Sequence, residues 1–293
     1  DLLVSFKEHE NDPRIPEVCA DMAKEMGEGK YYADLNVKMA QFELTLLDWA
    51  EAHKGARKYV AFADKCWPAF PSQFGFEPCY VNSRLVSRGI PVSCEVDIYG
   101  ALSEYIGLCI SNDAVTLLDI NNSVPQYIYD EDIKGKYDYK LTDTFMGFHC
   151  GNTPACKMCD SRAVKYQLIQ HRLLEPAGSE PDFTRGTLEG DIAASDITFY
   201  RLQSTADTKL RAYIAQGEVL PVATHSFGSI GVFAIPEMGR FYRHVLIEKN
   251  FPHHGAVAFG HYGKALFEIF KYLDVEEVGF NQPKGMLYPS ENP

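Results

Sequence analysis

"IPVSCEVDIYGALSEYIGLCISNDAVTLLDI", residues 90–120, contains two apolar runs on either side of one helical segment. The runs 90–95 and 114–120 have the length and apolar character of short buried strands. Residues 98–110 carry apolar side chains at helical spacing, and Asp97 stands where a helix N-cap is expected. This order of strand, helix and strand is typical of a parallel α/β sheet.

The residues before this stretch continue the same alternation. A helix is predicted over 35–53, a short strand over 58–64, and a second helix over about 77–87 that ends at Gly89. We therefore expect an α/β fold in which residues 1–112 form a doubly wound parallel module of the flavodoxin or Rossmann-like kind, incomplete at its N-terminus.

The pattern changes after Asn121, where loops rich in Tyr and Asp precede several short β-like runs. These runs cover residues 186–192, 197–204, 210–220 and 230–236, and two helices are predicted near 237–249 and 262–273. We expect residues 113–293 to form a β-rich α+β domain with an antiparallel, barrel-like sheet and terminal helices, and to carry catalytic residues.

Charge and hydropathy exclude several classes of partner. The chain has 28 basic and 40 acidic side chains, and its net charge of −12 repels phosphate backbones and anionic headgroups. No apolar run approaches the ~20 residues that cross a bilayer, and the first residues lack a signal-peptide pattern. We expect a cytoplasmic protein that binds neither nucleic acid nor membrane.

Acidic side chains close both apolar runs of the opening stretch. Glu95 and Asp119 lie near the carboxyl ends of the two predicted strands, where open parallel sheets bind ligands. In "FPHHGAVAFGH", residues 251–261, His253 and His254 stand at the entrance to an apolar strand, and alternation directs them to opposite faces. Two carboxylates and one imidazole suit Mn²⁺ or Mg²⁺ more than Zn²⁺. The alternative is capping or loop carboxylates and packed histidines.

The eight cysteines are unevenly spaced, as in a set of reduced thiols. One subset stands out in "HCGNTPACKMC", residues 149–159, which contains Cys150, Cys156 and Cys159 beside a histidine. A structural zinc site commonly uses two CxxC pairs, and this chain has one. Ordinary thiols beside a turn are favoured over a structural zinc or a redox role.

Five motifs together resemble the L-fucose isomerase family, which is related to the L-arabinose isomerases. They are "CEVDIYGALSEYIG", "TLLDINN", "FHCGN", "TLEGDI" and "NFPHHGAVAFGHYGKAL", in the family's order, and the likeness extends from about Asp64 to Asn281. The resemblance implies an aldose–ketose isomerase, an intramolecular oxidoreductase of carbohydrate metabolism. Its substrate class would be a deoxy-sugar, pentose or modified hexose, isomerised through a cis-enediol without an organic cofactor.

The resemblance also implies a metal site. Glu95, Asp119 and His254 match the family's metal ligands, with His253 as the second choice for the histidine. The metal would be Mn²⁺, with Mg²⁺ or another divalent cation as alternatives. Glu95 and Asp119 would serve both as ligands and as the acid/base pair, and which of them is the base in which step stays open.

Weaker candidates for sugar contacts are His149, Asn152, Trp67, Glu189 and His253. His149 and Asn152 in "FHCGN" can bind hydroxyl groups or can form a structural turn. Trp67 can stack on a sugar or belong to the core, and Glu189 can be a surface strand acid.

Family members usually carry a further N-terminal domain, and from the resemblance we expect this sequence to start partway through the module that follows it. In the family a neighbouring subunit of a homo-oligomer, a trimer or hexamer, completes the active site. Two other functional hypotheses stay open: a non-catalytic sugar-binding or regulatory module that keeps the pocket, and an interaction domain stapled by zinc at Cys150, Cys156 and Cys159. Loss of turnover in Glu95→Gln would indicate the enzyme.

Overall fold

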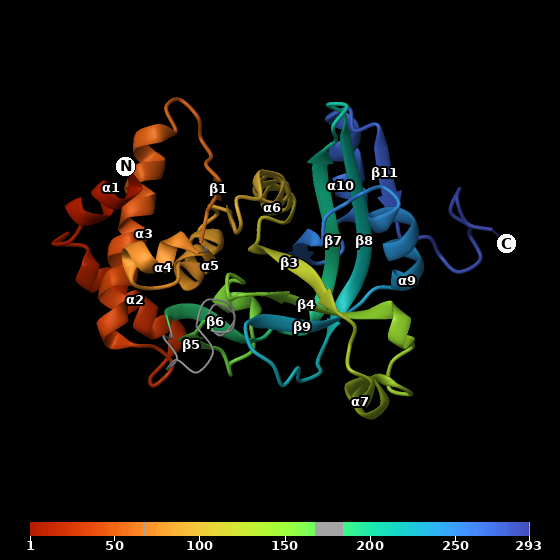
Figure 1. The fold of residues 1–293 in the computed structure, drawn as a ribbon, viewed down its shortest axis with the longest axis horizontal. Coiled ribbons are helices and arrows are strands. Elements are labelled where there is room, and N and C mark those ends of the chain that lie inside the picture. The colour runs from red at the N-terminus through yellow and green to blue at the C-terminus, as the bar shows by residue number, and fades with distance from the viewer. Residues whose placement is uncertain (67, 168–183, 293) are drawn as a thin grey trace.

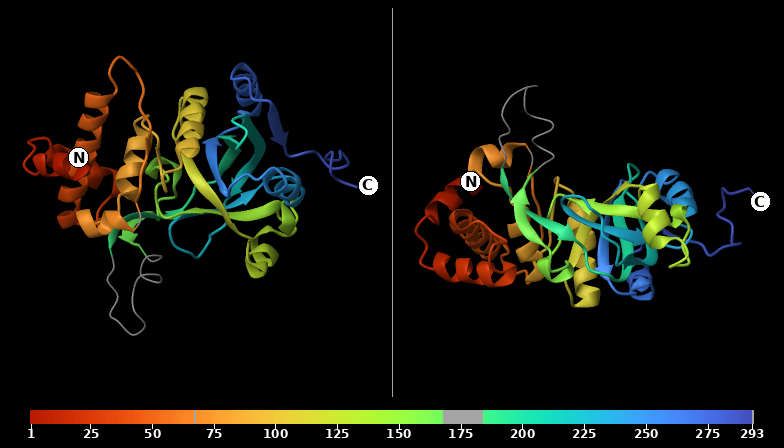
Figure 2. Two further views of the ribbon diagram at one scale, coloured as in Figure 1. Left: turned by 45° about the horizontal axis from the view of Figure 1, so that its top comes forward. Right: turned by 90° about the horizontal axis from the view of Figure 1, so that it is seen from below.

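The computed structural model describes residues 1–66, 68–167 and 184–292. Helices gather at the N-terminal end of the molecule and a large mixed sheet forms the other end (Figure 1). The expected α/β class is confirmed. Two further views show the same segregation, with the C-terminus far from the N-terminal helices (Figure 2).

The N-terminal helices share one apolar core. Met22, Met39, Phe42 and Phe76 are fully or almost fully buried in it. Because α3 packs against α1, α2 and α5, much of its surface is apolar or covered. The helices are α1 (Leu2–Glu8), α2 (Ile15–Met26), α3 (Ala33–His53), α4 (Ala69–Phe74) and α5 (Cys79–Ser87).

The expected parallel module is represented by one pair of short strands, β1 (Phe62–Ala63) and β2 (Val92–Ser93). The prediction that Glu95 ends a strand is wrong, because the ladder stops at Ser93 and the chain then turns. Glu95 and Val96 have φ of 63° and 59°, the left-handed region that non-glycine residues seldom occupy. This turn leads directly into α6 (Ile98–Ser111).

The expected third parallel strand is also wrong. Strand β3 (Val115–Asn122) pairs antiparallel with β10 (His254–Phe259) on one side and β4 (Thr144–His149) on the other. Its main partner is more than 130 residues away, so the local order of strand and helix did not reveal the pairing.

The large sheet has the order β11-β8-β7-β10-β3-β4-β9-β6-β5 among the described residues. An additional pairing of β8 with β9 closes β8, β7, β10, β3, β4 and β9 into a ring. The barrel-like expectation is therefore supported in part, since β11, β6 and β5 extend outside this ring. The remaining strands are β5 (Ala163–Tyr166), β6 (Arg185–Asp191), β7 (Ser195–Ser204), β8 (Leu210–Leu220), β9 (Ser229–Ala234) and β11 (Glu277–Phe280).

Short helical segments complete the C-terminal part. They are α7 (Gln126–Ile128), α9 (Met238–Phe241), α10 (Gly263–Tyr272), the 3-10 turns Leu141–Asp143 and Ala155–Lys157, and the π-helical turns Tyr129–Ile133 and Tyr242–Ile247. None of the helices in the described ranges has the length and apolarity needed to cross a membrane.

Helix α6 joins the two parts of the molecule and packs on β3, β7 and β10. Its Gly107 allows close approach, because a Cβ there would overlap the hydroxyl of Tyr200. That hydroxyl donates a hydrogen bond to the carbonyl of Ser103 in the same helix. The N-terminus of α6 therefore faces the ends of β3 and β10. The division of the chain at residues 112 and 113 stays a prediction.

Candidate functional site

Sheet register brings the predicted metal ligands together. Asp119 of β3 is directly opposite His254 of β10 and, on its other side, opposite Phe148 of β4. The last residue of β4 is His149. Two histidines and one carboxylate thus lie near the same end of three neighbouring strands, β10, β3 and β4.

The side chains meet at short distances. His254 Nε2 lies 3.1 Å from Asp119 Oδ1 and 3.6 Å from Glu95 Oε2, and the His254 side chain is only 7% exposed. His253 lies on the outer side: its Nε2 is 3.7 Å from Asp119 Oδ1, and its side chain is 59% exposed. The expectation that strand alternation directs these histidines to opposite faces is wrong, because His253 precedes β10 and both rings reach Asp119, with their centroids 4.7 Å apart.

A buried ion pair between Asp97 and Arg201 orients the ring of His254. Its Nδ1 is 3.0 Å from Asp97 Oδ2. Arg201 donates to both oxygens of Asp97, at 2.7 and 2.8 Å. Asp97 also caps α6 by accepting from the backbone N–H of Gly100 at 2.8 Å. Since Asp97 is an acceptor, Nδ1 carries the proton in a neutral ring and the Nε2 lone pair faces the other two carboxylates.

Sequence reasoning missed the second role of Asp97. Its position before a predicted helix was accounted for by N-capping, and no sequence feature indicated that Asp97 contacts a histidine 157 residues away. Arg201 lies in the middle of a predicted strand and carried no signal of its own. A carboxylate or carbonyl behind a ligating histidine is nevertheless a regular feature of metal sites.

The charges of the cluster are strongly coupled. Burial opposes ionisation of Asp97, but its hydrogen bonds with His254 and Arg201 outweigh burial and hold the pKa of Asp97 well below its usual range. Burial likewise opposes protonation of His254, but the carboxylates of Asp119 and Asp97 outweigh it and raise the pKa of His254 to about 9. The site at this end of the strands therefore attracts positive charge.

The residues fit a divalent cation. His254 Nε2 and Asp119 Oδ1 are buried, face each other, and have no hydrogen-bond partner of acceptable geometry among the described residues. Two lone pairs at this separation require a proton or a cation between them. With Glu95 they provide two carboxylate oxygens and one imidazole nitrogen, a set that suits Mn²⁺.

His149 is placed to contact a substrate. It is 2% exposed, and its ring centroid is 5.7 Å from that of His254. Its Nδ1 accepts a hydrogen bond from the backbone N–H of Cys150 at 2.9 Å, so the proton is on Nε2. That Nε2–H is buried and has no partner. A protonated nitrogen cannot ligate a metal, and His149 is therefore suited to donate to a substrate oxygen.

Comparison with known proteins agrees with the motifs. A family model described as L-fucose isomerase, C-terminal domain, matches residues 147–280. The resemblance to the L-fucose isomerase family is confirmed. His149 and His254 lie inside the matched residues, whereas Glu95 and Asp119 precede them.

Curated proteins that this chain resembles include sulfoquinovose isomerases. That of Priestia aryabhattai is 24% identical over 240 residues, which are 82% of this chain and 47% of the relative. That of Alkalicoccus urumqiensis is 23% identical over 250 residues, 80% of this chain and 49% of the relative. A shorter match, 36% identical over 70 residues, covers 22% of this chain and 16% of the enzyme of Clostridium sp. strain MSTE9. The chain spans about half the length of the relatives that it matches over most of its own length.

The other predicted sugar contacts differ in placement. Asn152 is 1% exposed, and its Oδ1 has no hydrogen-bond partner. Glu189 lies on β6 opposite Ala163 of β5, and burial raises its pKa. The described residues show no ion pair between Glu189 and the cluster of His254. Trp67 lies outside the described residues.

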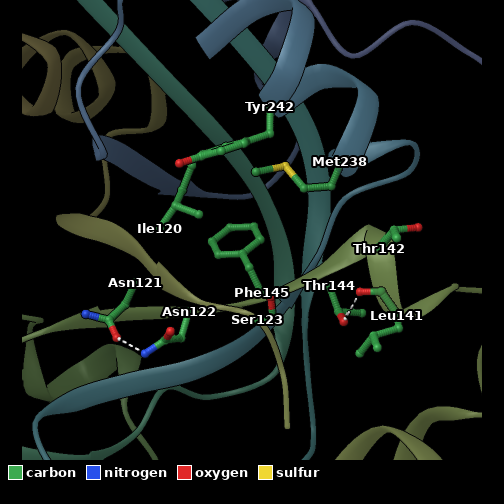
Figure 3. A pocket seen from close by; sticks show the side chains of 11 residues that line it. Ile120, Asn121, Asn122, Ser123, Leu141, Thr142, Thr144, Phe145, Met238 and Tyr242 are labelled. Carbon is green, nitrogen blue, oxygen red and sulfur yellow. Dashed lines mark hydrogen bonds between the residues drawn. The ribbon is translucent and has the colours of Figure 1, made fainter. Parts of the chain in front are cut away.

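One side of the cluster is open to solvent. The Glu95 side chain is 55% exposed, in contrast to that of His254. A cavity of about 470 Å³ lies close by, beyond the end of β3 (Figure 3). Its lining includes Ile120, Phe145, Met238 and Tyr242. It begins at the residue after Asp119 but does not include the candidate ligands, because successive strand residues point to opposite faces.

The zinc hypothesis for the CxxC motif finds no support in the geometry. Cys156 and Cys159 are both exposed. Over 1–66, 68–167 and 184–292, neither belongs to a group of three close metal-ligand atoms. The thiols of Cys66 and Cys94 do belong to such a group, which lies elsewhere in the fold.

Proposed function

We propose that this chain carries the metal-binding part of an aldose–ketose isomerase. The observation that carries the proposal is the facing pair of His254 Nε2 and Asp119 Oδ1, buried and without hydrogen-bond partners, with Glu95 beside them. The family match and the names of the curated relatives support sugar isomerisation. The proposed substrate class is a deoxy-sugar, pentose or modified hexose.

Glu95, Asp119 and His254 would hold the cation, for which Mn²⁺ is the first choice. When bound, the cation supplies a Lewis acid that orients neighbouring sugar oxygens and stabilises negative charge on them. Asp97, backed by Arg201, keeps the His254 ring in orientation and its Nδ1 protonated.

The carboxylates would move the protons. Isomerisation removes a proton from C2 and delivers one to C1 of the sugar, which needs groups that accept and donate near neutral pH. Glu95 is accessible from solvent, and its backbone is held in a left-handed turn, a form of strain that is common at active sites. Asp119 is more buried and lies opposite. We assign both transfers to this pair, and His149 Nε2–H to the stabilisation of a substrate oxygen.

The test is deuterium exchange. The complete gene product is incubated in D₂O with Mn²⁺ and a panel of aldoses, and proton NMR follows deuterium at C2 and formation of ketose. The wild type should show both with at least one sugar. Glu95→Gln should abolish them, whereas the exposed control Glu276→Gln should leave them unchanged. Absence of exchange with every sugar, in protein that holds Mn²⁺, would favour a sugar-binding module instead.

The open face of the site is consistent with completion by another subunit. We propose a homo-oligomer, trimer or hexamer, and analytical ultracentrifugation of the complete gene product measures its mass. The cytoplasmic location stays a prediction.

A further inference from the structure

A second group of ligand atoms lies next to the candidate site. The parallel pairing of Ala63 with Ser93 makes Asp64 and Cys94 the next residues along the two chains, and Asp64 N–H donates to the Ser93 carbonyl at 2.9 Å. Cys66 follows two residues later. One ligand atom from each of Asp64, Cys66 and Cys94 lies within 4.8 Å of the others. Backbone pairing therefore brings together three metal-ligating side chains.

The group is buried and incompletely satisfied. Cys94 is fully buried, and one oxygen of Asp64, Oδ1, is buried without a hydrogen-bond partner. The other oxygen accepts from Asn82 Nδ2 at 2.7 Å. Burial raises the pKa of Asp64 to about 6. A buried carboxylate with one unpaired oxygen is costly unless a cation or a proton compensates it.

We propose that Asp64, Cys66 and Cys94 form a second metal site, one that binds Zn²⁺. Two thiolates and one carboxylate are softer ligands than the Glu95, Asp119 and His254 set, and thiolates select zinc over Mn²⁺ and Mg²⁺. At a Zn–S distance of about 2.3 Å, tetrahedral ligand atoms are separated by roughly 3.8 Å, which the observed grouping allows.

The three ligands come from two segments of the chain. Asp64 and Cys66 lie in the loop after β1, and Cys94 follows β2 directly. A bound zinc ion would tie these segments together.

The position of the site gives it a structural purpose. Cys94 directly precedes Glu95, and the N–H of Val96 donates to the Asp64 carbonyl at 2.8 Å. Left-handed conformations at Glu95 and Val96 are strained and need support from their surroundings. A zinc ion on Asp64 and Cys94 would hold both sides of this turn. Only this consequence, the presentation of Glu95, rests on the proposed function.

Cobalt distinguishes the two sites. The complete gene product, reduced and stripped of metal, is titrated with Co²⁺, whose bonds to thiolate produce a near-ultraviolet charge-transfer band that carboxylate and imidazole ligands do not. The wild type should develop this band, and Zn²⁺ should displace it. Cys66→Ser and Cys94→Ser should lose the band, whereas Cys156→Ser, which changes an exposed cysteine, should keep it. His254→Gln should keep the band while losing the Mn²⁺ site.

Other outcomes overturn the proposal. A wild type without a thiolate band, or a band that disappears in Cys156→Ser and persists in Cys66→Ser, excludes the site. Thermal unfolding gives a second readout: Zn²⁺ should raise the Tm of the wild type and of Cys156→Ser but not of Cys66→Ser. If Cys94→Ser does not fold, the variant of the partly buried Cys66 and the wild-type spectrum still decide.

Discussion

The Asp97 carboxylate lies 3.0 Å from the ring Nδ1 of His254 and directs the opposite nitrogen toward Asp119. One residue therefore begins α6 and orients a candidate metal ligand. The bidentate contact from Arg201 keeps this carboxylate ionised. The geometry of the site thus depends on a buried ion pair that does not itself face the substrate side.

Asp97→Asn separates these roles. Asparagine caps a helix about as well as aspartate but cannot supply the charge that orients His254. We expect Mn²⁺ affinity to fall about 10–100-fold, as for other partners of metal-ligating histidines. Electron paramagnetic resonance of free Mn²⁺ measures the affinity. The exposed control Asp196→Asn should bind Mn²⁺ like the wild type, and equal affinity in Asp97→Asn would refute the orienting role.

The role assigned to His149 predicts that its substitution lowers kcat/KM for the sugar without changing Mn²⁺ affinity. Because its Nε2 carries a proton, His149→Phe should leave Mn²⁺ affinity unchanged. Loss of one buried hydrogen bond to substrate should lower kcat/KM roughly 5- to 150-fold, which corresponds to about 1–3 kcal/mol of transition-state stabilisation. His254→Gln should instead lose Mn²⁺ affinity. A fall in Mn²⁺ affinity in His149→Phe would show that His149 ligates the metal.

The burial of Glu104 in α6 predicts that the free energy of unfolding falls as the pH rises. Both its carboxylate oxygens are buried without hydrogen-bond partners. Burial, followed by the charges of Asp97 and Asp64, raises the pKa of Glu104 to about 8 from its ordinary 4.5. The folded state therefore holds a proton that the unfolded state releases. This contribution is complete below pH 4.5 and is lost as the pH rises toward 8 and above.

Glu104→Gln stays neutral and removes this titration. Between pH 5 and pH 8 the wild type should lose about 4 kcal/mol more of its free energy of unfolding than the variant does, from ~1.4 kcal/mol per pH unit. Urea unfolding of metal-free protein at the two pH values measures the difference. The exposed control Glu268→Gln should follow the wild type, and identical profiles for Glu104→Gln and wild type would mean that Glu104 ionises freely.

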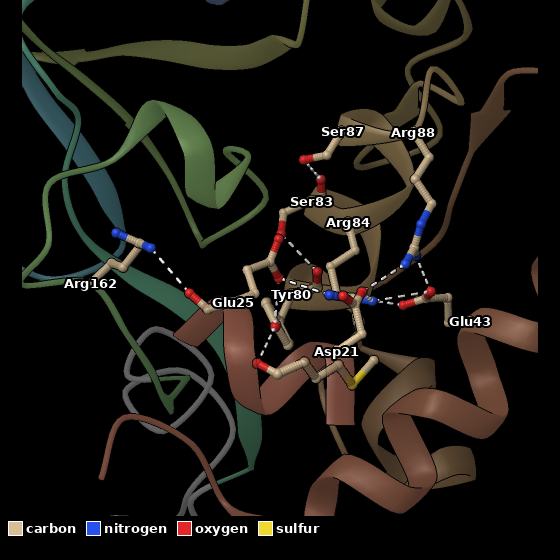
Figure 4. Close-up of polar contacts among 10 residues, drawn as sticks. Asp21, Glu25, Glu43, Tyr80, Ser83, Arg84, Ser87, Arg88 and Arg162 are labelled. Carbon is tan, nitrogen blue, oxygen red and sulfur yellow. Dashed lines mark hydrogen bonds and ion pairs between the residues drawn. The ribbon is translucent and has the colours of Figure 1, made fainter. Parts of the chain in front are cut away.

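A buried ion-pair network stabilises the N-terminal helices (Figure 4). Arg84 of α5 contacts Glu43 of α3 at 2.6 Å, and also Asp21 and Glu25 of α2. The side chains of Arg84 and Glu43 are 2% and 1% exposed. Arg88 also pairs with Glu43. Glu43 therefore contacts both guanidinium groups and is the most buried of the three carboxylates in this network.

Glu43→Gln should be strongly destabilising. Removing one partner of a buried ion pair leaves charge uncompensated, and we expect a loss of about 3–5 kcal/mol in the free energy of unfolding. The matched control is Glu51→Gln in the same helix, whose side chain is 70% exposed and paired with Lys54. Such a surface pair contributes about 0–1 kcal/mol. Urea denaturation compares them, and equal effects would show that the network is solvated.

Local features of the chain could be predicted from its sequence. The helix expected over 35–53 is α3, and the run 210–220 is β8. Asp97 caps α6 as its position indicated. These features depend on side-chain periodicity and on hydrogen bonds between residues that are close in the chain, so a short window contains their cause.

The family resemblance identified Glu95, Asp119 and His254 as candidates, but the sequence did not contain their geometry. Their meeting depends on the antiparallel register of β3 with β10, between segments far apart in the chain. Parallel alternation was the simpler local interpretation, and it assigned β3 to the wrong neighbours.

What the sequence by itself determined was therefore the class of fold, the main helices and strands, and the residue types of the candidate metal site. Tertiary structure alone decided that Asp97 stands behind His254, that Asp64, Cys66 and Cys94 converge, and that Glu104 is buried without a partner. The physical reason is that burial, desolvation and pairing depend on which distant segments pack together, and no local pattern of side chains specifies those partners.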